Sequence, residues 1–397
     1  AEGLEIATAA GDEWIASLVR IAMGAGLAMA GQDEAAVEWL SRALQGAQEC
    51  SDSFGACVAR LWLATVRRRQ GKLDLLPQLL PPALAACEDN GYDYLLTRPT
   101  FLGPPDERVF TPLLILARER GWRAEYAGRL LASLGLGQTT HHPGYRVRVY
   151  TLGAFAAFKG DAPIPANSWR RAKARQLFQL LLTYRHTALD RDQILEHLWP
   201  GMEPAAAGRN FKVTLNTLYQ VLEPDRPPGA DSAFVQRDGT AYCLRQGADL
   251  WLDAERFAAL VTQARAAGHE SPARAMPLLE EAVALYRGDY LPDALYEAWA
   301  AAERERLAVM FLGAADRLAE HYLDGGRFAP AIEIAHRILA ADNCWERAYR
   351  HLMIAYHHLG DRGQVARVYQ RCVQTLRDEL DVPPTAETAA LFAELRA

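Results

Sequence analysis

Apolar and polar positions follow helical spacing through residues 1–90, and this pattern repeats. Gly31 and Gly71 each follow a helical stretch and lie 40 positions apart, and Ala43-Leu44 recurs at the same interval as Ala83-Leu84. A fixed period of this length is typical of helix pairs that bury their apolar stripes against neighbouring pairs. The same spacing predicts a further helix over 112–134, and the stretch 135–144 is expected to be a linker.

The spacing changes at residue 145, where short alternating runs predict strands up to about 159. Three helical patterns follow, at about 169–184, after the capping residue Asp190, and at about 204–222. Two strand-like runs then flank Asp238-Gly239, which is a strong hairpin signal. Strands, three helices and a hairpin in this order are the layout of a winged helix.

Helical spacing returns at about 253 and continues to the end, again with a repeat. Similar residues recur at one constant interval: Leu318 and Leu352, Tyr322 and Tyr356, Gly326 and Gly360, Ala331 and Val365. The interval matches the tetratricopeptide repeat, a unit of about 34 residues that pairs two helices across a turn.

Together these patterns predict a mainly α fold, in which tetratricopeptide-like helical repeats lie on both sides of a winged helix-turn-helix (α+β) domain. We expect three domains: helical repeats over 1–140, a winged helix over 146–246 and a second repeat domain over 247–397. The chain starts with Ala rather than Met, so we expect a fragment whose upstream module, for instance an ATPase, is missing.

The formal net charge of −6 hides a strong asymmetry along the chain. Residues 145–246 carry 14 basic and 9 acidic side chains, net +5. The flanking segments are acidic, with 13 basic and 17 acidic residues before this segment and 16 and 23 after it. A basic segment between two acidic ones indicates a polyanionic partner such as double-stranded DNA.

The third predicted helix has the side chains needed to read base edges in the major groove. At about 100° per residue, Phe211, Leu215, Leu218 and Leu222 form a core stripe, and a polar face lies opposite. Arginine can chelate guanine, asparagine or glutamine can chelate adenine, and valine can meet a thymine methyl group. The candidates for base contact are Arg209, Val213, Asn216, Thr217 and Gln220.

A second set of basic residues is suited to backbone phosphates, which require positive charge and hydrogen-bond donors rather than a particular base sequence. Most of them crowd the start of the first predicted helix, one flanks the polar face of the third, and one lies in the predicted wing at about 233–245. The candidates are Arg170, Arg171, Lys173, Arg175, Lys212 and Arg237.

The residues from about 145 to the end resemble the antibiotic-regulatory family of bacterial activators. The matching stretches include 169–177 (WRRAKARQL), 192–200 (DQILEHLWP), 285–291 (LYRGDYL) and 303–307 (ERERL). In that family an OmpR-type winged helix precedes a tetratricopeptide-like bacterial transcriptional activator domain, and the resemblance also implies contact with RNA polymerase. Residues 1–140 resemble the helical repeats of MalT-like regulators.

The chain departs from the family pattern at two places. Family recognition helices often end in Leu-Arg-x-x-Leu, whereas this chain has Tyr219 in place of the arginine. The family wing reads Gly-x-Gly-Tyr, whereas Ala241 replaces the second glycine here. Because the arginine is lost, we expect weak phosphate binding by a single copy, which a homodimer on repeated half-sites would offset.

Sequence motifs for enzyme chemistry are absent. No GxxxxGK[ST], GxSxG or HExxH motif occurs, and the six cysteines form no CxxC pair, so we expect no enzyme activity, no cofactor and no bound metal. His351 and His358 share a helical face and are the one candidate metal pair, although a packed or solvated helix surface is the favoured interpretation.

We therefore expect a cytoplasmic, DNA-binding transcriptional activator with no membrane association, whose amino-terminal repeats receive a signal ligand or a protein. The alternative is a helical-repeat scaffold whose winged helix mediates protein–protein contact. The acidic total charge and the arginine-poor third helix favour this second interpretation.

Overall fold

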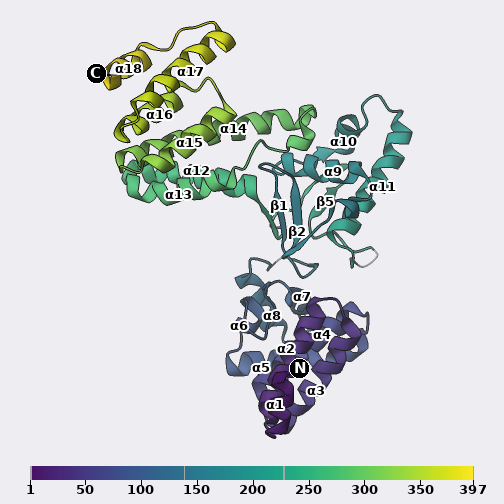
Figure 1. The fold of residues 1–397 in the computed structure, drawn as a ribbon. Coiled ribbons are helices and arrows are strands. Elements are labelled where there is room, and N and C mark those ends of the chain that lie inside the picture. The colour runs from purple at the N-terminus through teal and green to yellow at the C-terminus, as the bar shows by residue number, and fades with distance from the viewer. Residues whose placement is uncertain (1, 138, 227–228, 397) are drawn as a thin grey trace. The chain divides into compact units, whose positions relative to one another are not determined.

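The computed structural model describes residues 2–137, 139–226 and 229–396 (Figure 1). Helices dominate and the strands form two small sheets, so the predicted mainly α fold with helical repeats is confirmed. The chain divides into two compact units. Unit 1 contains Ala1–Val147 and Phe158–Leu250, and unit 2 contains Arg148–Ala157 and Trp251–Ala397.

The amino-terminal part of unit 1 is a series of antiparallel helices that end at regular intervals. Left-handed residues follow five successive helices at a constant spacing, at Gly11, Gly31, Ser51, Gly71 and Gly91. Glycine suits these positions because it adopts positive φ without steric cost. The helices are α1 (Glu2–Ala9), α2 (Glu13–Met29), α3 (Asp33–Glu49), α4 (Ser53–Arg69), α5 (Leu76–Asn90), α6 (Tyr94–Thr97), α7 (Thr111–Arg120) and α8 (Ala124–Ser133), and the 3-10 turn η1 (Leu73–Leu75) precedes α5.

Two expectations for the end of this part need revision. The single helix predicted over 112–134 is two helices, because Gly121 adopts a φ of +73° and ends α7. The expected linker 135–144 includes residue 138, which lies outside the described residues, but His142 within it is only 3% exposed. Arg108 and Arg146 both donate to the carboxylate of Asp249, which holds the residues around this stretch in place.

The middle of the chain contains the predicted strands, helices and hairpin. A four-stranded sheet has the order β3-β2-β1-β7, and a three-stranded sheet has the order β4-β6-β5. The strands are β1 (Val147–Tyr150), β2 (Ala156–Lys159), β3 (Ala162–Pro163), β4 (Leu189–Asp190), β5 (Val235–Asp238), β6 (Ala241–Leu244) and β7 (Leu250–Leu252). The helices are α9 (Ala172–Thr183), α10 (Arg191–Leu198) and α11 (Pro204–Leu222), and the 3-10 turn η2 (Ala166–Trp169) precedes them.

The hairpin turn lies one residue later than the sequence pattern suggested. β5 pairs antiparallel with β6 from Val235↔Leu244 to Asp238↔Ala241, so Gly239 and Thr240 form the two-residue turn. Gly239 has a φ of +58°, which a hairpin turn of this length requires at its first position. Asp238 therefore belongs to the strand.

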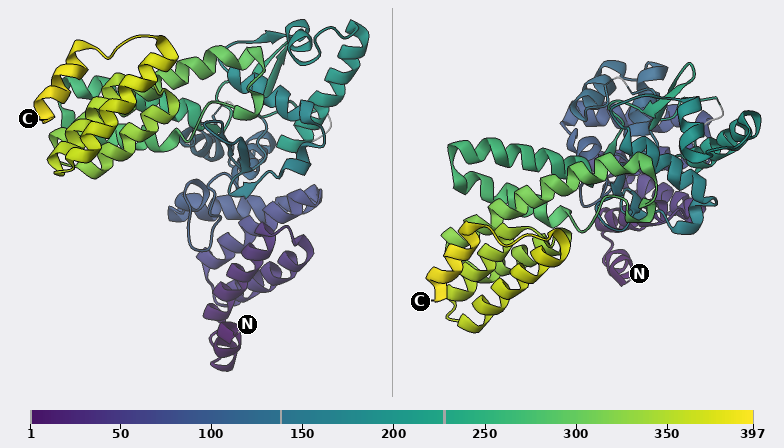
Figure 2. Two further views of the ribbon diagram at one scale, coloured as in Figure 1. Left: turned by 45° about the horizontal axis from the view of Figure 1, so that its top comes forward. Right: turned by 90° about the horizontal axis from the view of Figure 1, so that it is seen from above.

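Unit 2 is likewise built from antiparallel helices, which run side by side in green and yellow in Figure 2. Gly326 and Gly360, with φ values of +69° and +77°, mark the same turn in two successive repeats. The helices are α12 (Asp253–Glu270), α13 (Pro272–Leu285), α14 (Ala298–Asp324), α15 (Phe328–Ala341), α16 (Glu346–His358), α17 (Arg362–Leu380) and α18 (Ala386–Arg396). The segment between α13 and α14 was expected to be helical. It is instead a loop that contains the 3-10 turn η3 (Pro292–Ala294).

A short segment from the middle of the sequence completes unit 2. Asp253, which is fully buried, accepts hydrogen bonds from the backbone N–H and hydroxyl of Thr151 at 2.7–2.9 Å and from the N–H of Leu152 at 2.9 Å. Leu152 also forms an isolated antiparallel bridge with Tyr290. These bonds attach residues 151–152 to the start of α12 and to the loop before α14.

Candidate nucleic-acid interface

Helix α11 is the element that the sequence pattern assigned to base reading, and its predicted bounds match the structure. The Glu203 carboxylate caps it by accepting from the N–H groups of Ala205 and Ala206, and Pro204 occupies the first turn, where its missing N–H costs nothing. Phe211, Leu218 and Leu222 are buried, as predicted, whereas Leu215 is half-buried.

The opposite face of α11 carries no acidic side chain along its exposed ridge. Five of the candidate residues on this helix are exposed: Arg209, Lys212, Val213, Asn216 and Gln220. Val213, in the middle of the helix, is 46% exposed. The ridge therefore presents a guanidinium, an ammonium, two amides and a methyl-bearing side chain from one rigid element.

One predicted base-contact residue does not lie on this ridge. Thr217 is only 8% exposed, and its hydroxyl donates to the carbonyl of Val213 at 2.9 Å. The sequence projection placed Thr217 at the edge of the polar face, and a threonine in a helix commonly satisfies its hydroxyl on the preceding turn. The structure thus contradicts a role for Thr217 as an exposed member of the base-reading set.

The β5–β6 hairpin is packed directly onto α11. The ring of Tyr242 meets the ring of Phe211 edge to face, with centroids 5.0 Å apart. Arg237 lies exposed on β5, where its Nε donates to the carbonyl of Gly239 at 2.9 Å and its guanidinium lies 5.8 Å from the Tyr242 ring. The basic side chain of the hairpin is therefore positioned beside the helix by a turn carbonyl and an aromatic ring.

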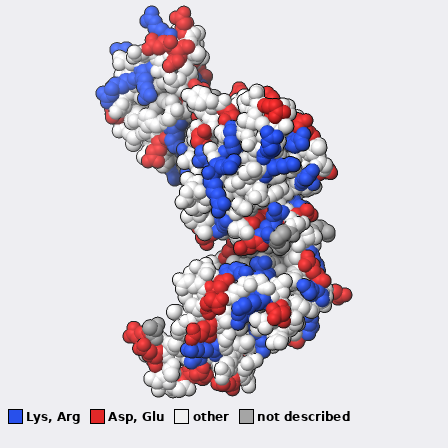
Figure 3. All heavy atoms as spheres, turned by 90° about the vertical axis from the view of Figure 1, so that its right-hand side faces the viewer, with Lys and Arg blue, Asp and Glu red and all other residues white. Residues whose placement is uncertain are grey.

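A groove of about 690 Å³ runs between α11 and the hairpin. Its lining contains five basic side chains and no carboxylate. They are Arg191, Arg209, Lys212, Arg226 and Arg237. Figure 3, which shows the side on which α11 lies in Figure 1, displays Lys and Arg side chains gathered close together over the middle of that face.

Two members of this groove, Arg191 and Arg226, were not predicted from the sequence. Arg226 stacks over the ring of Tyr219 at 4.4 Å and donates to the carbonyl of Ala230. It follows the helix in a Pro-rich stretch, where periodicity gives no signal. Arg191 forms an ion pair with Asp192 at 3.0 Å. It directly follows the predicted cap residue Asp190, and this position at the start of a helix is the sequence feature that could have identified it.

Helix α10 and the hairpin turn are joined through Asp190. Asp190 caps α10, as the sequence predicted; it forms a capping box with Gln193 and also accepts from the hydroxyl of Thr240 at 2.6 Å. The backbone N–H of Arg191 donates to the Thr240 carbonyl at 3.0 Å. The hydrogen bonds from Thr240 and from the backbone of Asp192 lower the pKa of Asp190, so this carboxylate remains an acceptor at neutral pH.

The far end of α11 is fixed by a buried carboxylate. Glu223, 2% exposed, accepts from the N–H of Ala233 at 2.7 Å and from the hydroxyl of Ser232. Burial raises the pKa of Glu223, although both hydrogen bonds act in the opposite direction. The Tyr145 hydroxyl donates to the carbonyl of Leu222 at 2.6 Å. The helix end and the start of the hairpin are thus held together.

The predicted phosphate-contact residues near the first helix fall into two groups. Arg170 and Arg171 are exposed and precede α9, which begins at Ala172 rather than at about 169. Lys173 and Arg175 lie within the helix and are half-buried. Arg170 has a φ of +47°, which turns the backbone sharply between η2 and α9.

Nothing in the described part of the chain forms a group of three or more His, Cys, Asp or Glu side chains that could hold a metal ion. The ring of His351 is buried and its Nε2 lies 2.9 Å from Asp316 Oδ1, while His358 stacks on Phe328. The two histidines singled out in the sequence are thus both engaged in packing. Across the described residues, no helix combines the length and apolar character required to cross a membrane.

Comparison with solved structures finds a similar fold in Mycobacterium tuberculosis EmbR in complex with a low-affinity phosphopeptide. It superposes with a TM-score of 0.53 at 21% identity, over 63% of this chain and 65% of the EmbR chain. This chain therefore spans slightly less than two thirds of EmbR. Because the identity is low, the likeness concerns the fold alone.

Comparison with known sequences finds transcriptional regulators of two bacteria. The transcriptional regulator RedD of Streptomyces coelicolor is 27% identical over 266 residues, which cover 66% of this chain and 73% of RedD. The transcriptional regulatory protein MoaR1 of Mycobacterium tuberculosis is 25% identical over 225 residues, 56% of this chain and 71% of MoaR1. Residues 252–396 match the family described as the bacterial transcriptional activator domain, so the chain is a relative of bacterial transcriptional regulators.

Proposed function

We propose that this chain is a sequence-specific DNA-binding transcriptional activator. The observation that carries the proposal is the basic groove between α11 and the β5–β6 hairpin, which has five cationic side chains and no carboxylate in its lining. In this proposal residues 146–246 act as an OmpR-type winged helix. Helix α11 enters the major groove, and the hairpin is the wing.

The chemistry of the exposed ridge supports base reading. Arg209 can donate two hydrogen bonds to guanine O6 and N7, and Asn216 or Gln220 can pair with adenine N6 and N7. Val213 is suited to a thymine methyl group because its apolar surface is exposed. Phosphate contacts fall to Lys212, Arg237 and the arginines that precede α9.

The relatives support the regulatory role of the whole chain. RedD and MoaR1 are named as transcriptional regulators, and the activator-domain match covers most of unit 2. We propose that unit 2 supports dimerisation or contact with RNA polymerase, and that the helical repeats of residues 1–140 receive a signal. A homodimer on repeated half-sites would raise the affinity of a single weak interface.

The decisive experiment is selection of binding sites from a random-sequence duplex pool with the full chain, at two salt concentrations. We expect an enriched motif whose affinity falls as salt rises, because phosphate contacts release counterions. In vitro transcription from a promoter with that motif would then test activation. Absence of any enriched motif, with binding that does not depend on sequence, would favour the scaffold alternative and direct the search to a protein partner.

Substitutions on α11 separate base reading from phosphate contact. Arg209→Ala and Gln220→Ala should each cost about 1–3 kcal/mol on the selected site and relax the preference at one position, since a bidentate base contact is lost. Lys212→Ala should weaken all duplexes about equally. Arg42→Ala, which removes an exposed pair with Glu38 on α3, is the matched control and should bind like wild type. Wild-type binding by all three α11 variants would exclude this docking face.

A further inference from the structure

A second basic pocket lies on the flank of α11 that faces away from the hairpin. It has a volume of about 180 Å³ and is far smaller than the groove of about 690 Å³ on the hairpin side. Its lining comes from the end of β2, from η2 and from the last turns of α11. The lining residues are Lys159, Ser168, Arg170, Thr217, Gln220 and Val221.

The two hollows are on opposite sides of the base-reading ridge. Tyr219 lines the hairpin-side groove and Thr217 lines the second pocket. Since residues of an α-helix advance by about 100° each, these two positions point about 160° apart around the helix axis. Gln220 lies between them on the exposed ridge and borders the second pocket. The exposed ridge is thus flanked by positive charge on both sides.

The lining of the second pocket has the composition of an oxyanion site. It offers the Lys159 ammonium, the Arg170 guanidinium, the Ser168 hydroxyl and the Gln220 amide, and no carboxylate is among the lining residues. Burial lowers the pKa of Lys159, which means that its charge is incompletely solvated in the free protein. An anion placed beside the ammonium would offset that loss of hydration.

The side chains of this pocket project from fixed parts of the fold. Lys159 is the last residue of β2, and its Nζ lies 5.9 Å from the centre of the Tyr145 ring. Arg170 follows Trp169, which is 4% exposed and stacks on Phe178 with ring centroids 5.8 Å apart. The backbone N–H of Arg170 donates to the Asn167 carbonyl at 3.2 Å. The backbone that carries the two cations is therefore fixed before binding.

We propose that the second pocket binds a backbone phosphate of the DNA strand that borders α11 on the side away from the hairpin. A major groove about 12 Å wide accepts a helix of about the same diameter, so both strands must flank a docked helix. The hairpin-side groove serves one strand, and Lys159, Ser168 and Arg170 serve the other. Thr217 is then part of the pocket wall rather than a base reader. This inference rests on the proposed DNA-binding function.

The test measures the salt dependence of DNA binding by the full chain carrying Lys159→Gln, on the selected duplex and on an unrelated duplex of the same length. We expect affinity for both duplexes to fall several-fold. The slope of log K against log salt should become shallower by about 0.9, the value for one lost phosphate contact. The base preference should stay as in wild type. Lys72→Gln, an exposed lysine before η1, is the matched control and should leave the slope unchanged.

A second variant guards against a folding defect. Ser168→Ala removes a neutral donor from the same pocket, so it should weaken both duplexes without a change of slope, and its circular dichroism should match wild type. Ethylation interference should then identify one phosphate, on the strand away from the hairpin, whose modification impairs wild type but not Lys159→Gln.

The outcomes distinguish this inference from the proposed function. If Lys159→Gln keeps the wild-type slope while Arg209→Ala relaxes base preference, the second pocket is not a phosphate site although the chain binds DNA. If the chain enriches no motif and neither variant changes its binding, the proposed function fails as well. If inorganic phosphate binds wild type but not Lys159→Gln, and leaves DNA affinity the same as chloride does at equal ionic strength, the pocket takes free phosphate and the assignment to the DNA backbone is overturned.

Discussion

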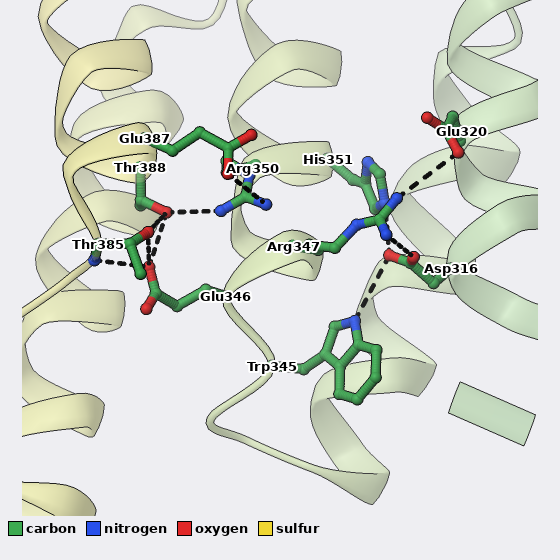
Figure 4. A network of polar contacts seen from close by, with 10 residues as sticks. All are labelled: Asp316, Glu320, Trp345, Glu346, Arg347, Arg350, His351, Thr385, Glu387 and Thr388. Atoms are coloured by element: carbon green, nitrogen blue, oxygen red, sulfur yellow. Dashed lines mark hydrogen bonds and ion pairs between the residues drawn. The ribbon is translucent and has the colours of Figure 1, made fainter. Parts of the chain in front are cut away.

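Asp316 is the centre of a buried polar network between α14 and α16 (Figure 4). Its carboxylate lies 2.9 Å from His351 Nε2 and 3.1 Å from a guanidinium nitrogen of Arg347, and it also accepts from Trp345 Nε1 at 3.4 Å. Burial alone would raise the pKa of Asp316, but the hydrogen bond from His351 and the charges of His351 and Arg347 more than offset it, so the pKa is lowered. The network therefore stabilises unit 2 while the carboxylate is ionised.

We expect Asp316→Asn to destabilise α16 by about 3 kcal/mol, because it removes the charge from a side chain that is 4% exposed and leaves its partners unmatched. Native-state hydrogen exchange of the α16 amides should then be faster by roughly a hundredfold. Glu320→Gln is the control. Its carboxylate is 53% exposed and lies 3.6 Å from the same Arg347, so exchange should hardly change.

The ionised Asp316 carboxylate also predicts that the stability of unit 2 depends on pH. Because the pKa of Asp316 is lowered in the folded protein, its contribution is present at pH values above the ordinary pKa of aspartate and is lost as pH falls through the lowered value. The stability difference between wild type and Asp316→Asn should therefore hold down to about pH 4, near the ordinary pKa of aspartate, and shrink below it, as measured by urea titration. A difference that stays constant as the pH falls below this value would show that the charge does not contribute.

For single residues, the helical projection predicted the exposed ridge of α11 well. It placed Arg209, Val213, Asn216 and Gln220 on one face because their spacing follows the helix period, and all four are exposed. It failed for Thr217, whose exposure depends on neighbouring β2 and η2 residues that lie far away in the chain. Exposure at the edge of a helical face is set by the partner element, which periodicity does not contain.

Among the elements, the ends of the amino-terminal helices carry the clearest repeat. Four of the five evenly spaced left-handed positions hold glycine, and Ser51, with a φ of +55°, holds a residue with a Cβ. The glycines at 31 and 71 were visible in the sequence as a repeat, but the interval of half that length was hidden by this serine. Spacing of glycines thus predicted helix pairs and missed one of the turns between them.

We expect Ser51→Gly to raise the free energy of unfolding by about 0.5–1 kcal/mol, because glycine relieves the steric cost of the left-handed backbone. Gly71→Ala should lower it by about 1 kcal/mol. A Cβ at Gly71 would meet no atom within 4 Å, so this loss would be due to the backbone alone. Thermal unfolding followed by circular dichroism measures both changes.

Gly26→Ala serves as the internal comparison for these variants. Gly26 lies within α2, and a Cβ there would also meet nothing within 4 Å. Since its backbone is helical, alanine should stabilise the protein by up to about 1 kcal/mol. If Gly26→Ala and Gly71→Ala changed stability in the same direction, backbone conformation would not be the cause.

For the whole molecule, the division into two units does not follow the order of the sequence. Residues 148–157 belong with 251–397, and the hydrogen bonds that join them link residues about a hundred positions apart. Hydrophobic periodicity describes neighbours along the chain. It therefore predicted the helices and strands on both sides, but it gave no sign of the hydrogen bonds that attach residues 151–152 to Asp253. The sequence pattern indicates Asp253 only as the start of a helix.

We expect Thr151→Val to destabilise unit 2 by about 1–2 kcal/mol. It keeps the shape of the side chain but removes the hydroxyl that donates to Asp253 at 2.7 Å. Thr262→Val, which removes an exposed hydroxyl bonded within α12 to the Ala258 carbonyl, should cost less than about 0.5 kcal/mol. Protection of α12 amides in hydrogen exchange reports both effects. Equal losses of stability in the two variants would mean that the hydrogen bond between Thr151 and Asp253 contributes nothing beyond an ordinary surface hydroxyl.

The placement of residues 148–157 has a consequence for recombination between relatives. The polypeptide passes from one unit to the other three times, after positions 147, 157 and 250. A single crossover near 250 would therefore pair a foreign Thr151 and Leu152 with the native Asp253. Cleavage of the backbone at any one of these three positions would leave the two units covalently joined through the other two. A functional chimera of this protein requires the short insert 148–157 to be exchanged together with the carboxyl-terminal helices.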